Sequence, residues 1–378
     1  MSKPTTKNTY RFVGTLTAVT GLTVTRPDDN FASHTGSAFR LSRKAGRLPR
    51  MGAMHESSPV YFPATSLRGA IRRAGRNAIR RAVIQDTGNE TPWSVDTHYM
   101  LTQGVDTTNQ TLSEKVSGAI GVDRDLRGEN PFLSLFGRWK LPGHVGIDNA
   151  LPRDHDCVYV EGKGARSNDF NRDPEQIKFL SVEDAKRLKD IMEQDSLAAE
   201  ETGDIDGEIR QLKKEISVIK DKDEKSEMNE QIKELEAQKK AVKAAKSGSQ
   251  ESIQRPIEGF EAIQPGTEMD HRMLVQNATD MELGLYLACL REFARNPVVG
   301  GHRALNCGEI RCEWTVRYWP ETESQPIVAG TVTLSSDGFS IGNEDAEKTL
   351  SSALAIWDAA AKAPSDHKLN FERFLLVA

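Results

Sequence analysis

The chain has 378 residues, of which 37% are hydrophobic and 28% are charged, and its mean hydropathy is -0.54. At roughly 150 residues per domain, this length predicts two to three domains. The sequence has no run of about 18 or more apolar residues, which excludes a transmembrane helix, and its first residues lack the apolar stretch of a secretory signal. The cysteines are too few and too scattered for a disulfide framework, so we expect reduced thiols in a cytoplasmic protein (Cys157, Cys289, Cys307 and Cys312).

The net charge of -5 hides a segregation of charge along the chain. Residues 1–90 contain fifteen Lys and Arg against five Asp and Glu, a local net charge of +10, whereas residues 181–246 contain fourteen basic and eighteen acidic residues. A strong local excess of positive charge is typical of surfaces that bind polyanions. A solvated basic surface has the same composition, and the pattern within the basic quarter decides between the two.

The N-terminal half predicts one clear strand and one clear helix. Apolar and polar residues alternate over 10–20, which predicts a strand, and a basic amphipathic helix follows over about 65–84. Residues 21–60 show no sustained period, and such a long irregular segment is usually functional or disordered. Residues 153–173 are polar and turn-rich, which predicts a projecting hairpin with a short strand at 157–160.

Residues 181–246 predict two amphipathic helices that fold back on each other as an antiparallel hairpin. Both a dimerisation coiled coil and an inserted hairpin are compatible with this pattern, and the short arms favour the insertion. The apolar residues recur at spacings of three and four on both sides of a charged break (Ile205, Ile209, Leu212, Ile216 and Ile219, then Met228, Ile232, Leu235 and Val242).

The C-terminal third begins with a predicted strand and a capped helix. Thr279 and Glu282 form a capping-box motif at the start of that helix. The glycine-rich loop 300–308 could bring backbone amides close to a ligand, although it is also an ordinary tight connection. The order of elements predicts an α+β fold with an antiparallel sheet of the split βαβ kind (strands 269–277 and 309–319, helices about 280–296 and 347–361, and a short apolar end at 374–377).

The helix over about 65–84 carries arginines along one face and apolar residues along the other. Advancing by about 100° per residue places Arg68, Arg72, Arg76 and Arg80 within about 120° of one another, with Arg73 beside them. The segment Ala64–Ser66 offers an N-cap hydroxyl at a helix start suited to anions. Between residues 40 and 81 the only acid among eleven basic residues is Glu56, which predicts a phosphate-binding surface that includes the preceding loop (Arg40, Arg43, Lys44, Arg47 and Arg50). The alternative is a surface helix with solvated arginines.

Signals for catalysis are weaker. The carboxylate pairs Asp28–Asp29 and Asp154–Asp156 could hold Mg²⁺ for phosphodiester cleavage, but acidic turn residues are far more common than catalytic ones. Cys307 and Cys312 are a conceivable metal pair without a second pair of suitable spacing. The sequence lacks the P-loop, Rossmann, nucleophile-elbow and HExxH motifs. We therefore predict no catalytic residue, no metal and no cofactor.

Three stretches carry a family resemblance. Residues 62–72, FPATSLRGAIR, are similar to the helix start P-x-[ST]-S-[LI]-[KR]-G-x-[LIF]-R, and residues 130–137, NPFLSLFG, resemble an "LFG" segment. The third stretch runs from the strand near Leu274 through 296–301 into the glycine-rich loop. Together they resemble the RAMP superfamily of CRISPR-associated antiviral proteins, specifically the Cas-seven-type backbone subunit that coats the guide RNA. The resemblance covers residues 10–140 and 255–320.

The resemblance implies a modified ferredoxin-like (RRM-like) palm with finger/web and thumb insertions and an inserted helical hairpin. Residues 1–152 and 251–378 would form the two parts of the palm, 153–180 a candidate thumb, and 181–250 the helical insertion. The helical insertion departs from the minimal family pattern and resembles the elaborated form in type IV effector complexes.

The implied function is a non-catalytic subunit that binds guide RNA (crRNA). It would oligomerise along that RNA as a helical filament, with further CRISPR effector subunits as partners and no membrane, and it would present bases for pairing with target DNA or RNA. Besides the loop 40–50, the implied RNA-binding residues lie at the helix start and in the glycine-rich loop (Ser66, Arg68, Arg72, Arg73 and Arg76, then Gly300, Gly301, His302 and Arg303).

Two alternatives stay open. Type III subunits cleave target RNA with an aspartate in the loop between the first strand and the helix. Residues 30–59 hold no aspartate, and Asp28 and Asp29 lie before the family position, so we expect no nuclease activity. The first alternative is a metal-dependent endoribonuclease of that kind, and the second is a structural coiled-coil protein with an incidental basic helix.

Overall fold

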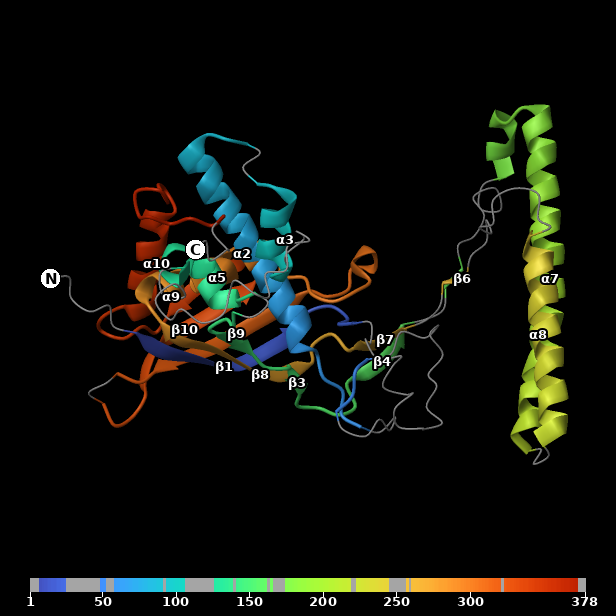
Figure 1. Cartoon of the computed structure of the whole chain (residues 1–378), viewed down its shortest axis with the longest axis horizontal. Coiled ribbons are helices and arrows are strands. Elements are labelled where there is room, and N and C mark those ends of the chain that lie inside the picture. The colour runs from blue at the N-terminus through green and yellow to red at the C-terminus, as the bar shows by residue number, and fades with distance from the viewer. Residues whose placement is uncertain are drawn as a thin grey trace. The chain divides into compact units, whose positions relative to one another are not determined.

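The structure is a computed structural model. It divides into two compact units, one formed by residues 1–161 and 260–378 and the other by residues 162–259 (Figure 1). The described residues are 7–24, 48–51, 58–90, 93–105, 126–138, 141–161, 164–165, 174–218, 222–244, 256–257, 260–320 and 323–372.

An antiparallel sheet organises the first unit. Its strands follow the order β11-β10-β9-β1-β8-β2, and β3 also pairs with β8. Every described pairing in this sheet is antiparallel, which confirms the predicted α+β fold with an antiparallel sheet. The strands are β1 (Asn8–Ala18), β2 (Val145–Ile147), β3 (Leu151–Pro152), β8 (Glu268–Ala278), β9 (Ile310–Tyr318), β10 (Ile327–Ser335) and β11 (Gly338–Gly342).

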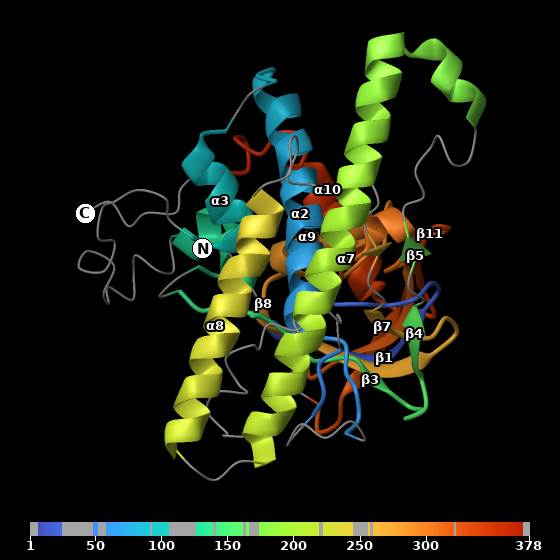
Figure 2. The same cartoon turned by 90° about the vertical axis from the view of Figure 1, so that its right-hand side faces the viewer.

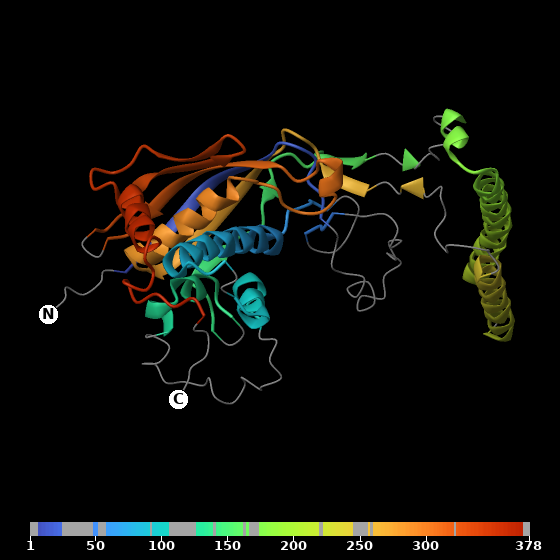
Figure 3. The ribbon, with the colours of Figure 1, turned by 90° about the horizontal axis from the view of Figure 1, so that it is seen from above.

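Alternation along the central strands gives the sheet one buried and one exposed face. In β1, Phe12 and Leu16 are fully buried, whereas Arg11 and Val13 are exposed. The period of two turns successive side chains to opposite faces, so the sequence pattern that predicted these strands also sets their orientation. Three helices cover the buried face, as Figures 1 and 3 show: α2 (Ala64–Thr87), α9 (Asp280–Phe293) and α10 (Thr349–Ala360).

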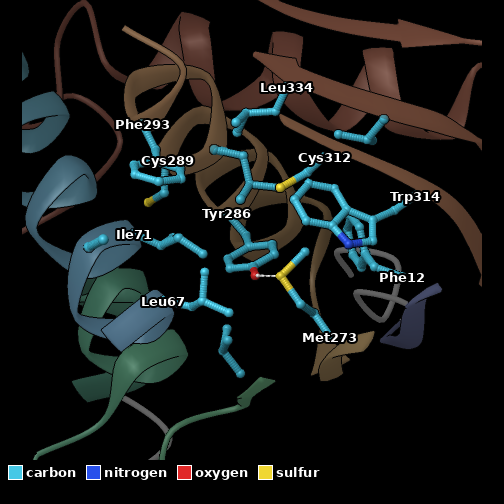
Figure 4. Close-up of a cluster of buried hydrophobic side chains, with 14 of the residues drawn as sticks. Phe12, Leu67, Ile71, Met273, Tyr286, Cys289, Phe293, Cys312, Trp314 and Leu334 are labelled. Atoms are coloured by element: carbon cyan, nitrogen blue, oxygen red, sulfur yellow. Dashed lines mark hydrogen bonds between the residues drawn. The ribbon is translucent and has the colours of Figure 1, made fainter. Parts of the chain in front are cut away.

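The core lies between these helices and the sheet (Figure 4). The rings of Tyr286 and Phe12 meet edge to face at a centroid distance of 5.7 Å, and the Tyr286 hydroxyl donates to the Met273 sulfur at 3.0 Å. Helix α2 approaches α9 closely because Gly75 has no side chain, and a Cβ there would lie 2.4 Å from the Cys289 sulfur. Two further helices complete this side, α3 (Val95–Gln103) against α2 and α5 (Pro131–Phe136) against α9.

The two predicted helix starts have different outcomes. The capping box of α9 is confirmed: the Thr279 hydroxyl accepts from the Glu282 amide, and the Glu282 carboxylate accepts from the Thr279 amide at 2.8 Å. The hydroxyl cap expected for α2 is wrong. This helix begins directly after Pro63, which leaves Ser66 inside the first turn, and the amide of Ala64 donates instead to Asn149 Oδ1 at 2.8 Å.

The strand predicted at 157–160 forms as β4 (Val158–Glu161), but its partner is distant in sequence. β4 pairs with β7 (Phe260–Ile263) rather than with a second strand inside 153–173. In the described residues, long-range pairing of β4 with β7 therefore stands where a local hairpin was expected. Leu22 also forms an isolated bridge to Ile263.

The second unit contains the predicted helical hairpin. It consists of α7 (Val182–Val218) and α8 (Lys222–Ala244), preceded by the short helix η1 (Pro174–Phe179). On either side of these helices in the sequence, β5 (Gly164–Ala165) pairs with β6 (Pro256–Ile257). Figure 2 shows α7 and α8 side by side. Their seam buries Ile205, Ile209 and Ile232, and Lys239 of α8 pairs with Asp206 of α7. The helices therefore pair within one chain.

In the described part of the chain, none of the helices combines the length and apolar character that crossing a bilayer requires.

Candidate nucleic-acid interface

Helix α2 buries a wider arc than the helical wheel predicts. Besides Leu67, Ile71 and Ile79, the buried residues include Arg72, which is only 6% exposed. A long arginine side chain can leave its own sector of the helix and reach neighbouring elements. The wheel gives the direction of a Cβ atom but not the position of a guanidinium group, so arginines predicted to share one face of α2 differ in what they contact.

Arg72 caps the C-terminal ends of two other helices. Its guanidinium donates to the carbonyls of Leu101 and Met100 at 2.7 Å, near the end of α3, and to those of Phe136 and Gly137 at 3.2 and 3.0 Å, at the end of α5. Carbonyls at a helix C-terminus lack partners within the helix and carry the negative end of its dipole. Burial, with the nearby charge of Arg68, lowers the pKa of Arg72 to about 10, so the side chain stays charged at neutral pH.

Arg68 has a similar role beside it. It donates to the carbonyls of Val145 in β2 and Phe136 in α5 at 2.5 and 2.7 Å, and burial lowers its pKa. The prediction that Arg68 and Arg72 face an RNA backbone is therefore wrong for Arg72, which is buried on four carbonyls, and stays a prediction for Arg68, which is half-buried. Arg72 donates to four backbone carbonyls and Arg68 to two, and their bonds to Phe136 and Gly137 join the helix-start stretch 62–72 to the "LFG" stretch 130–137.

In the loop before α2 the structure describes one of the predicted basic residues, Arg50, and a carboxylate neutralises its charge. Arg50 forms a two-point ion pair with Glu261, with distances of 2.9 and 3.1 Å, and its side chain is 9% exposed. The assignment of Arg50 to an RNA-binding surface is therefore corrected, because the carboxylate of Glu261, which is distant in sequence, already pairs with its guanidinium. The other predicted loop residues lie outside the described residues (Arg40, Arg43, Lys44 and Arg47).

Four arginines remain on an accessible surface, which we call the basic face: Arg73, Arg76 and Arg80 of α2, and Arg303. The three on α2 lie within about 60° of the helix circumference. Arg73 and Arg80 are exposed and Arg76 is half-buried. Among the residues that the structure describes, none of the four pairs with an Asp or Glu; Arg76 donates to Asn77 Oδ1 at 2.7 Å and Arg303 to the Val298 carbonyl at 3.1 Å.

The charges of the basic face repel one another. Partial burial and the nearby Arg303 lower the pKa of Arg73, and partial burial together with Arg80 and Arg73 lowers the pKa of Arg76. By contrast, Arg81 on the same helix pairs with Glu292, which raises its pKa. Like charges without counter-charges cost free energy unless an anion offsets them. The basic face is therefore the part of α2 suited to phosphate groups.

The predicted glycine-rich loop lies at the start of α2. Gly300 has a φ of 78°, and a Cβ there would lie 2.1 Å from the carbonyl oxygen of Thr23 and 3.5 Å from the Phe62 ring. The amide of Gly301 donates to the same Thr23 carbonyl at 2.9 Å. Only glycine fits at position 300, because the backbone is both left-handed and in close contact. The loop thereby holds Arg303 near Arg73.

His302 follows these glycines and stacks on Phe260. The two rings are 3.9 Å apart and inclined by 5°, and Phe260 is buried whereas His302 is exposed. Sequence reasoning named His302 but missed Phe260, because forty-odd residues separate them and no periodic pattern connects them. Ser66, the remaining predicted residue, is half-buried in the first turn of α2.

The alternative sites do not assemble in the described residues. The Asp154 carboxylate accepts from the Asp156 amide at 2.9 Å, which is a turn contact. Cys307 and Cys312 belong to separate buried clusters. No group of three His, Cys, Asp or Glu side chains suited to a metal ion occurs among the described residues, and Asp28 and Asp29 lie outside them.

No protein-family model matches the chain, and no curated protein matches it.

Proposed function

We propose that this chain is a non-catalytic RNA-binding subunit that holds the sugar–phosphate backbone of single-stranded RNA on its basic face. One observation carries the proposal: Arg73, Arg76, Arg80 and Arg303 converge on one accessible surface and have no carboxylate partner among the described residues. Contacts to phosphate position a nucleic acid without reading its sequence. Bound in this way, the RNA keeps its base edges free for pairing with a target strand.

We further propose that the first unit is a ferredoxin-like palm. The chain order β1, α2, β2, β8, α9, β9 follows the β-α-β-β-α-β pattern, and β1 lies between β8 and β9 in the sheet. Both crossover helices, α2 and α9, pack on the same face, as that pattern requires. This arrangement supports the palm that the family resemblance implies.

The family resemblance supports a more specific assignment, the backbone subunit of a CRISPR effector complex of the type IV kind. In this assignment the ligand is guide RNA, and the partners are further copies of the chain, other effector subunits and the target strand. The contacts of Arg68 and Arg72 with stretch 130–137 give these two stretches a shared structural role. Both stretches are then needed to set the orientation of α2 and so of the basic face.

RNA affinity measured against salt tests the basic face. For the purified chain and a fluorescent single-stranded RNA, we expect affinity to fall by orders of magnitude between about 50 and 200 mM salt. The variant Arg73→Ala/Arg76→Ala/Arg80→Ala should bind at least tenfold more weakly. Its slope of log affinity against log salt should be shallower by about 2, since each single-strand phosphate contact contributes roughly 0.7.

The control variant removes the same charge from the uncovered face of the sheet. Arg11, Arg311 and Arg317 are exposed on β1 and β9, and their replacement by alanine should leave the salt slope unchanged. Equal losses of RNA affinity in both variants would show that net charge alone drives binding. A wild-type chain that does not bind RNA in low-salt buffer would refute the proposed function.

The guide-RNA assignment has its own test. RNA that copurifies with the chain from cells is sequenced, and we expect discrete molecules that share a repeat-derived end. Heterogeneous fragments of abundant cellular RNA would contradict the assignment while leaving RNA binding intact.

A further inference from the structure

The stacked pair of His302 and Phe260 forms a flat platform whose outer residue, His302, is exposed. Phe260 is 3% exposed and belongs to a small cluster with Ala262, Cys307 and Tyr159. It covers one face of the His302 ring at 3.9 Å, nearly parallel. His302 is nevertheless exposed, and Phe260 accounts for only one face of its ring, so the other ring face and the ring edge are the parts of the ring that a ligand could contact.

The backbone fixes this platform in place at a conformational cost. His302 and Asn306 both have left-handed φ values, 49° and 57°, which non-glycine residues adopt rarely. The His302 carbonyl accepts from the Leu305 amide at 2.9 Å, and the amide of Gly308 donates to the Gly21 carbonyl at 3.0 Å. Backbone conformations of this kind persist where the surrounding structure imposes them, and they concentrate at binding sites.

The platform borders the basic face. Arg303 is the next residue after His302, and it lies close enough to Arg73 for their charges to interact. A flat ring next to a row of cations is the combination that single-strand-binding surfaces use: the cations contact phosphates, and the ring stacks on a base. In a duplex both faces of each base are already stacked, so a duplex cannot use the platform.

We propose that His302 stacks on an unpaired nucleobase, so that the basic face accepts single-stranded RNA in preference to duplex. The inference rests on the proposed function, because the phosphates of the same strand occupy the basic face. It adds a base contact that tolerates any sequence, since every base offers a π face. His302 then makes the site prefer single-stranded RNA over duplex RNA, and its ring contacts a base rather than a phosphate.

An oligomer with bases and an abasic oligomer of the same charge distinguish base stacking from phosphate binding. The affinity of the full chain is measured for a short fluorescent oligouridine, for an abasic ribose–phosphate oligomer of the same length, and for a duplex. We expect the wild-type chain to bind oligouridine roughly tenfold more tightly than the abasic oligomer, the size of one stacking contact.

Three variants identify the ring as the cause. His302→Asn keeps a side chain that tolerates the left-handed backbone but removes the ring, and it should abolish the tenfold preference. His302→Phe keeps a flat ring and should retain most of that preference. His367→Ala removes an exposed histidine elsewhere in the first unit and should change nothing. Circular dichroism melting confirms that each variant is folded.

The outcomes distinguish this proposal from the one on which it rests. Tight RNA binding with the same oligouridine preference in His302→Asn would overturn the stacking role alone. Loss of that preference in both His302→Asn and His302→Phe would also overturn it, because a flat ring would then be insufficient. A wild-type chain that binds none of the three ligands at low salt would overturn both proposals.

Discussion

His271 is a buried histidine that stays neutral in the folded protein. It lies in β8, and its ring meets that of Trp314 in β9 across Gly14 of β1, which has no side chain to separate them. The indole Nε1 of Trp314 donates to His271 Nδ1 at 3.2 Å. Burial lowers the pKa of His271 from 6.5 to about 4, although the backbone and charge of Asp148 act in the opposite direction.

This depressed pKa predicts a loss of stability in mild acid. Between about pH 6.5 and pH 4 the unfolded chain binds a proton at His271 that the folded chain does not, so the free energy of unfolding falls as the pH falls. The shift corresponds to about 3 kcal/mol across this window. Urea unfolding midpoints at several pH values check it. We expect the pH slope to be smaller in His271→Asn, which keeps an acceptor for Trp314 but does not titrate.

A second buried group, Glu282, responds only below about pH 4.5 and so does not contribute between pH 4.5 and 6.5. Burial raises the pKa of Glu282, but hydrogen bonds from His144, Ser134 and the Thr279 amide lower it by more, so its net shift is downward from 4.5. Its contribution to stability is complete above about pH 4.5 and is lost only below that value. Identical slopes for the wild-type chain and His271→Asn between pH 4.5 and 6.5 would contradict the role of His271.

At the scale of the element, α2 has two glycines in opposite environments. Gly75 faces α9, where a Cβ would lie 2.4 Å from the Cys289 sulfur and 2.8 Å from the Phe132 ring. Gly69 lies on the accessible side, where the nearest heavy atom to a Cβ is the Nη1 of Arg73, at 3.2 Å, at the end of a flexible side chain. The same helix thus contains one glycine needed for packing and one that is not.

The identical substitution at the two positions should have opposite effects. Gly75→Ala forces α2 away from α9 and should lower the free energy of unfolding by about 1–3 kcal/mol. Gly69→Ala should raise it by up to about 1 kcal/mol, because alanine favours a helix interior over glycine. Chemical denaturation of both variants measures the two changes. A shift of the same sign in both would contradict the packing of α2 against α9.

At the scale of the whole molecule, the chain contains two compact units with separate cores. The core of the first unit is formed by the sheet and α2, α9 and α10, whereas the second has its own apolar seam between α7 and α8. Glu161 and Phe260, the residues that flank the second unit in sequence, are directly opposed in the β4–β7 pair. A two-residue turn can therefore join them.

Replacement of residues 162–259 by Asn-Gly should give a folded chain that still binds RNA. Asn-Gly favours the type I′ turn that connects directly opposed antiparallel strands. Because the basic face and the His302 platform both belong to the first unit, we expect the salt slope and oligouridine affinity to match those of the full chain. If the shortened chain folds but no longer binds RNA, the helical hairpin would be part of the RNA-binding surface.

The sequence by itself determined the parts of this protein that depend on local periodicity and short motifs. Alternation in β1, β8 and β9, the capping box of α9 and the apolar spacing of α7 and α8 each follow from interactions within a few residues along the chain. The basic character of the N-terminal quarter and the glycine-rich loop at 300–308 were likewise readable. These features need no knowledge of what packs against them.

Only the tertiary structure decided which arginines are available to a ligand. Arg72 and Arg73 are neighbours in sequence, yet one is buried on the carbonyls of α3 and α5 and the other is exposed beside Arg303. Arg50 pairs with Glu261, and His302 stacks on Phe260, although the members of each pair are far apart in the sequence and no local pattern connects them. A long, charged or aromatic side chain binds whatever partner the fold brings within reach, and that partner is set by the packing of distant segments.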